Sequence, residues 1–124
     1  MSTIKTTTLS TQGGSTVPVD TVVNGTAKAW VNFNGTGTVA IRRAFNVSSI
    51  TDNGTGDYTV NFTTAMVDVN YSPQITSGWT PGVDNSSFPG VRANGITTTT
   101  MRFSNVNNGD AAYDSTNLNV AIFS

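Results

Sequence analysis

The chain contains no cysteine, no histidine and no glutamate. Without cysteine it forms no disulfide and no thiolate metal site, and without histidine neither a Ser-His-Asp nor a Cys-His nucleophile system can be assembled. All seven acidic residues are aspartates, and their spacing selects no pair of the kind that a glycosidase needs. We therefore expect no enzymatic activity, no metal site and no cofactor.

Charge is also scarce. Charged residues make up 10% of the chain and the net charge is -1, where a typical soluble domain has roughly 25% charged residues. With so few basic side chains to contact phosphates, we expect no nucleic-acid partner. The first thirty residues contain no apolar segment behind a basic start, and no stretch reaches the roughly 20 apolar residues of a membrane helix. We expect neither Sec export nor membrane insertion.

The residues that are present favour β-structure. Ala29, Val31 and Phe33 occupy every second position of their segment, and apolar residues also occupy every second position within 58–62 and 118–123. This period of two is typical of half-buried strands. No window combines helical spacing with good helix formers. At 124 residues the length suits one domain. The pattern predicts an all-β fold, an antiparallel β-sandwich of jelly-roll-like type or a small barrel.

Turn residues divide this domain into segments. The pattern predicts strands at 28–33, 39–47, 58–63, 71–76, 96–103 and 118–123. Pro73 favours an edge position for the strand that contains it. Residues 51–56 read as a hairpin turn, and we favour that interpretation over a calcium-binding loop.

Two segments lie outside this pattern. Residues 1–25 are polar, rich in threonine and broken by glycine and proline, which predicts an extended arm that orders against a partner, or else a frayed terminus. Residues 26–124 then form the sandwich. The second segment, 78–95, is crowded with glycine, proline, asparagine and serine, and a connection of that length is usually a functional loop.

The side chains of the second segment suggest a binding role. Flat aromatic rings, amides and charges are the groups that recognise sugars or protein surfaces. The alternative is that the two aromatic side chains fold back and hold the loop against the sandwich. The candidate receptor contacts are Trp79, Asp84, Asn85, Phe88 and Arg92.

Three further residues are candidate contacts between subunits. Arg42 and Arg43 can pair with aspartates across strands or across a subunit boundary, because a guanidinium binds a carboxylate through two hydrogen bonds; solvated surface is the alternative that we favour. Trp30 alternates with the apolar face at 29, 31 and 33. It either completes a second buried sheet face, which we favour, or lies in an oligomer contact.

One long block resembles a known group of proteins. Residues 27–66, AKAWVNFNGTGTVAIRRAFNVSSITDNGTGDYTVNFTTAM, followed by Asn70-Tyr71-Ser72, closely resemble a segment of small structural and tail-fibre proteins of tailed bacteriophages. The closing TTTMRFSN and LNVAIF are similar to the final strands of the same unit, and the start MSTIKTTTL is similar to fibre-type N-termini. The segment 79–94 has no counterpart in this resemblance.

The resemblance implies a virion component of a tail fibre or appendage, assembled in the host cytoplasm and often trimeric. Its partners would be further copies of itself, other virion or tail proteins, and a glycan or protein of the host surface. A purely architectural decoration protein without a receptor role and a stand-alone carbohydrate-binding module are the two alternatives. The resemblance brings no catalytic motif with it.

Overall fold

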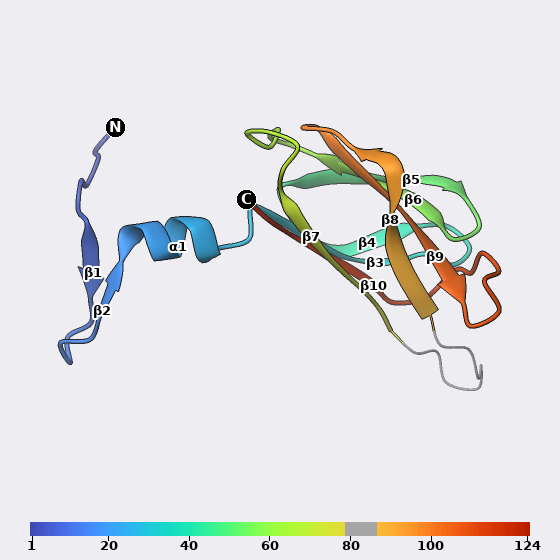
Figure 1. The fold of residues 1–124 in the computed structure, drawn as a ribbon, viewed down its shortest axis with the longest axis horizontal. Coiled ribbons are helices and arrows are strands. Elements are labelled where there is room, and N and C mark those ends of the chain that lie inside the picture. Colours follow the sequence, from blue (N-terminus) through green and yellow to red (C-terminus); the bar gives the residue numbers. More distant parts are fainter. Residues whose placement is uncertain (79–86) are drawn as a thin grey trace.

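The computed structural model describes residues 1–78 and 87–124. Two four-stranded antiparallel sheets pack face to face, and a short arm precedes them (Figure 1). One sheet has the order β4-β3-β10-β7 and the other the order β5-β6-β9-β8. The strands are β3 (Ala29–Asn34), β4 (Ala40–Phe45), β5 (Val47–Gly54), β6 (Asp57–Phe62), β7 (Ser72–Ser77), β8 (Ser87–Ile96), β9 (Thr100–Asn107) and β10 (Leu118–Phe123). The predicted all-β sandwich is confirmed.

The core lies between the two sheets. Alternate residues of β3, β6, β9 and β10 point inward, so each of these strands presents one apolar face. The rings of Phe33, Tyr58 and Phe103 meet at the centre, with centroid separations of 5.3 to 6.3 Å. The inward faces predicted at 29, 31 and 33, at 58, 60 and 62, and at 118, 120 and 122 are all buried. These apolar contacts join the two sheets.

The chain passes from one sheet to the other at Asn46, between β4 and β5. This residue has φ 53°, a left-handed conformation that asparagine tolerates better than most residues. The single strand predicted for 39–47 is therefore wrong: it is two strands in two sheets. The β5–β6 hairpin is confirmed, although β5 continues to Gly54, so that its turn is shorter than the predicted 51–56.

The second half of the predicted functional loop is a strand. Residues 87–95 belong to β8, which pairs with β9 at the edge of its sheet. The strand predicted at 96–103 is wrong as well, because a turn at residues 97–99 separates β8 from β9. Asn94 and Gly95 look like loop residues in sequence, but the ladder between Val91 and Ile96 is irregular and accommodates them, whereas Gly90 pairs regularly with Ser104. The edge position predicted from Pro73 is confirmed in β7.

The arm consists of a small hairpin and one helical segment. The hairpin strands β1 (Thr8–Ser10) and β2 (Thr16–Pro18) pair with each other, and α1 (Val19–Gly25) follows. Figure 1 shows these elements set apart from the sandwich. None of the residues of α1 is buried. The apolar side chains of the arm thus find no core of their own.

The central ring cluster provides a test of this fold. Phe33→Ala removes a fully buried ring and leaves a cavity, so we expect it to lower the free energy of unfolding by about 3–5 kcal/mol. Phe88→Ala is the matched control, because this ring is 55% exposed, and it should change stability by no more than about 0.5 kcal/mol. Urea unfolding at one fixed protein concentration measures both. Equal effects of the two substitutions would contradict the assignment of the core.

Candidate functional site

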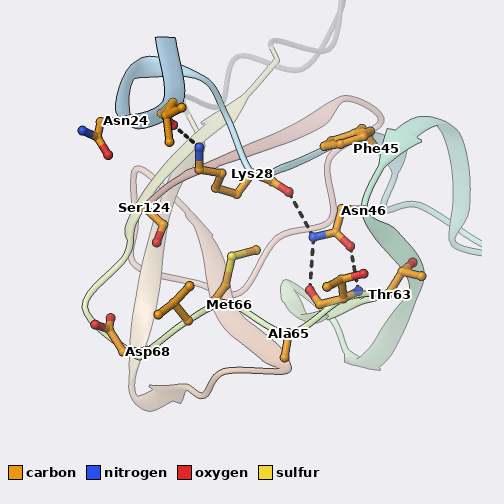
Figure 2. A pocket seen from close by; sticks show the side chains of 12 residues that line it. Asn24, Lys28, Phe45, Asn46, Thr63, Ala65, Met66, Asp68 and Ser124 are labelled. Carbon is orange, nitrogen blue, oxygen red and sulfur yellow. Dashed lines mark hydrogen bonds between the residues drawn. The ribbon is translucent and has the colours of Figure 1, made fainter. Parts of the chain in front are cut away.

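A cavity of about 760 Å³ opens where the arm joins the sandwich. We call it the end pocket. It is lined by Val23 and Asn24 of α1, by Lys28, Phe45 and Asn46, by residues 63–68 and by Ser124 (Figure 2). These segments are far apart in the sequence, and the sandwich brings them together at one end.

Asn46 holds the pocket wall in place. Its Nδ2 donates to the carbonyl oxygen of Lys28 at 3.0 Å and to that of Thr64 at 3.1 Å, and its Oδ1 accepts from the Thr64 amide at 2.7 Å (Figure 2). The left-handed corner that takes the chain between the sheets therefore also ties the start of β3 to the segment after β6. Lys28 Nζ in turn donates to the carbonyl oxygen of Val23.

The rim of the end pocket is apolar and open. Phe45 is 55% exposed, Val67 is 93% exposed and Val23 of α1 is 51% exposed, whereas Met66 is buried. The charged side chains of the lining are Lys28 and Asp68. Such a lining receives apolar side chains and offers no arrangement for acid-base or nucleophilic chemistry.

A second, smaller depression of about 370 Å³ lies on the outer face of the β4-β3-β10-β7 sheet. We call it the amide groove. Its lining comes from three adjacent strands: Trp30, Val31 and Asn32 of β3, Asn119, Val120 and Ala121 of β10, and Gln74 and Thr76 of β7. Every side chain of this lining is uncharged.

An ion-pair cluster occupies the outer face of the other sheet. Asp57 accepts from Arg102 Nε at 2.9 Å and from Arg102 Nη2 at 2.7 Å, and Arg92 Nη2 lies 3.1 Å from the same carboxylate. The hydrogen bond from Arg102 and the charges of both arginines lower the pKa of Asp57, against the opposing effect of burial. The carboxylate is thus ionised and tied to β8 and β9.

Two of the five candidate receptor contacts, Phe88 and Arg92, are among the described residues. Trp79, Asp84 and Asn85 lie outside the described residues. Phe88 is on β8 and exposed, so it does not fold back onto the sandwich. Arg92 is also on β8, but its guanidinium is paired with Asp57. Of the two described candidates, Phe88 presents the more accessible binding group.

The candidate subunit contacts all lie on β3 and β4. The favoured placement of Trp30 in a core is wrong: the residue is 36% exposed on the outer face, because the second sheet covers only the inner one. Arg42 donates to Asn32 Oδ1 at 3.5 Å and to the carbonyl oxygen of Thr116. Arg43 is exposed and lies opposite Asn32 in the ladder. The solvated placement favoured for both arginines agrees with their exposure.

Sequence reasoning missed both concave surfaces. The alternation of Trp30 with Asn32 and of Asn119 with Ala121 was visible, but the groove depends on β7 lying beside β10 and β3, which is a matter of strand order. The end pocket depends on a left-handed corner at Asn46, where sequence indicated a continuous strand. The only local signal was an asparagine inside that strand.

Comparison with known proteins finds no matching family, no matching curated protein and no matching solved structure. Within residues 1–78 and 87–124, no three His, Cys, Asp or Glu side chains gather where they could hold a metal ion. Over the same part of the chain, no helix has the length and apolar character needed to cross a membrane.

The Asp57 cluster predicts how stability depends on pH. The folded pKa of Asp57 is lowered, while an unfolded aspartate titrates near pH 3.9. The ionised carboxylate therefore stabilises the fold above about pH 3.9, and this contribution is lost as pH falls through the lower folded pKa. We expect Asp57→Asn to be less stable than the unsubstituted chain at pH 7, with the difference shrinking below about pH 4.

Urea unfolding at pH 7 and pH 2.5 measures this difference. Asp110→Asn serves as the control, since Asp110 is exposed in a turn and should show no such change with pH. If the two substitutions followed the same pH profile, the arginine pairs of Asp57 would not stabilise the fold.

Proposed function

We propose that this chain is a structural subunit of a bacteriophage virion, of tail-fibre or appendage type, which assembles as a homotrimer and attaches to the host surface. The resemblance of residues 27–66 to phage structural proteins supports the virion assignment. The observation that carries the assembly is the arm, whose helix α1 buries none of its residues beside an open apolar pocket.

Burying the exposed apolar side chains of the arm against a partner would lower the free energy. Val22 and Val23 are 39% and 51% exposed, and Ile4 and Leu9 are also exposed. Burying such side chains is worth about 25 cal/mol for each Å² removed from water, and a seven-residue helix is too short to be stable alone in water. In the proposed assembly, the exposed apolar side chains of one subunit's arm pack against a neighbouring subunit.

Covered sheet edges fit the same proposal. The strands β4, β7, β5 and β8 form the four edges of the two sheets, and an exposed edge is a site for uncontrolled pairing unless charge, proline or a neighbour protects it. Charge or proline protects three of these edges, through Arg42 and Arg43 on β4, Pro73 on β7 and Arg92 on β8, so β5 is the edge that most needs a neighbour. A neighbouring subunit would supply that protection.

A mass measurement under native conditions tests the assembly. We expect the full chain to have the mass of three chains of 13.0 kDa each. Val23→Asp, which places a charge at the rim of the end pocket, should lower that mass toward one chain. Val69→Asp is the matched control, an exposed valine between β6 and β7 that does not line the end pocket, and should leave the mass unchanged. A monomeric full chain would exclude the trimer and favour the carbohydrate-binding module.

Cell binding separates adhesion from pure architecture. We expect the purified trimer to bind to cells of a susceptible host, and Phe88→Ala, which removes an exposed ring at the β8 edge, to weaken that binding severalfold. A trimer that binds no cells of any host tested would be an architectural subunit.

A further inference from the structure

The shape of the amide groove follows from the strand register. Ala121 of β10 lies between Trp30 of β3 on one side and Gln74 of β7 on the other. In the next row of the same face, Asn119 lies between Asn32 and Thr76. Because the methyl group of Ala121 is the smallest side chain of this row, it forms the bottom of a depression between the indole of Trp30 and the amide of Gln74.

The polar groups of the groove are held in fixed positions. Asn32 Nδ2 donates to Asn117 Oδ1 at 2.7 Å and to Asn119 Oδ1 at 2.6 Å. Gln74 Nε2 donates to Ser72 Oγ at 3.1 Å. Side-chain amides both donate and accept hydrogen bonds, so a ligand that offers both kinds of group can pair with a set of side chains already oriented for it.

The lining selects a ligand that is neutral, partly apolar and rich in hydroxyl groups. The residues that line the groove carry no charge. The guanidinium of Arg42 reaches its edge, but it already donates to Asn32 Oδ1 at 3.5 Å and to the carbonyl oxygen of Thr116. A purely apolar ligand would cover the amides without replacing their hydrogen bonds to water, which is unfavourable. A peptide strand adds to a sheet edge and not to a sheet face. A sugar ring has an apolar C–H face for the indole and hydroxyl groups for the amides.

We propose that the amide groove binds a neutral saccharide, with one sugar ring against Trp30 and its hydroxyl groups bonded to Asn32, Asn119 and Gln74. The volume of about 370 Å³ is at the small end of the roughly 300–1,000 Å³ usual for ligand pockets, which suits one or two sugar units of a longer chain. This inference rests on the proposed function, because it names the class of host-surface ligand. The groove itself lies within one subunit, so binding to it does not require the trimer.

Binding of defined oligosaccharides tests the proposal. The probes are maltohexaose, cellohexaose and chitohexaose, which are neutral, and hexagalacturonate, which is acidic. We expect at least one neutral probe to bind, by calorimetry, and to shift the side-chain amide NMR signals of Asn32, Asn119 and Gln74. Hexagalacturonate should bind at least tenfold more weakly than that neutral probe.

Variants locate the site. Trp30→Ala should weaken binding of the neutral probe at least tenfold, Trp30→Phe should retain most of it because a flat ring remains, and Gln74→Ala should weaken it severalfold. Asn61→Ala, which removes an amide from the outer face of the other sheet, is the matched control and should bind as the unsubstituted chain does. Circular dichroism and thermal unfolding verify that each variant is folded.

The outcomes separate this inference from the proposed function. The groove proposal is overturned if no neutral probe binds, if folded Trp30→Ala binds as well as the unsubstituted chain, or if Asn61→Ala alone abolishes binding. It is also overturned if Trp30→Ala dissociates the trimer, because the groove is then a subunit contact and the virion proposal stands. Saccharide binding by a monomer supports the groove and removes the trimeric fibre.

Discussion

The structure depends on the contact between two apolar sheet faces at the ring cluster of Phe33, Tyr58 and Phe103. With no cysteine and no histidine in the chain, neither a disulfide nor a histidine-ligated metal reinforces this contact. The cluster is also anchored at its polar edge. The single hydrogen of the Tyr58 hydroxyl is shared between Asp114 Oδ1, at 2.6 Å, and the carbonyl oxygen of Gly35, at 2.8 Å. Burial together with the Asp114 carboxylate raises the pKa of Tyr58.

That anchor closes one end of the sandwich. A β-carbon at Gly35 would lie 2.5 Å from the Tyr58 hydroxyl oxygen, so only glycine lets the turn after β3 approach the ring. The fully buried Asn105 continues the closure, because its Nδ2 donates to the carbonyl oxygen of Tyr113 at 2.7 Å and its Oδ1 accepts from Ser87 Oγ at 2.7 Å. Apolar packing joins the sheets, and hydrogen bonds between loops and strands close this end.

Alternation in the sequence predicted the buried faces because a half-buried strand has a strict period of two, which is a local property. The predictions that were wrong depended on non-local geometry. Asn46 turns the chain into the other sheet because its side chain bonds to segments near residues 28 and 64, and no spacing rule reveals those partners. The segment 87–95 looked like a loop because of its glycines and asparagine, yet Gly90 pairs regularly with Ser104, and Asn94 and Gly95 lie where the ladder is irregular. Trp30 was misplaced because its chemical type suggested a core, whereas the face it shares with Asn32 is polar.

Because charged side chains are scarce, the outer faces of the two sheets combine one ion-pair cluster with hydrogen bonds between uncharged amide and hydroxyl groups. On the β5-β6-β9-β8 sheet, one carboxylate pairs with two arginines, while Asn61 Nδ2 donates to Ser49 Oγ and Thr51 Oγ1 across the β5–β6 pair. On the opposite sheet, amides bond to one another around Asn32. Contacts between neutral amides and hydroxyl groups vary little with ionic strength, because salt screens charges and leaves such hydrogen bonds largely unaffected. The amide-rich face of the β4-β3-β10-β7 sheet is therefore suited to hold a neutral ligand or a neighbouring subunit over a wide range of salt concentration. The strand register fixes the shape and the hydrogen-bond geometry of that face.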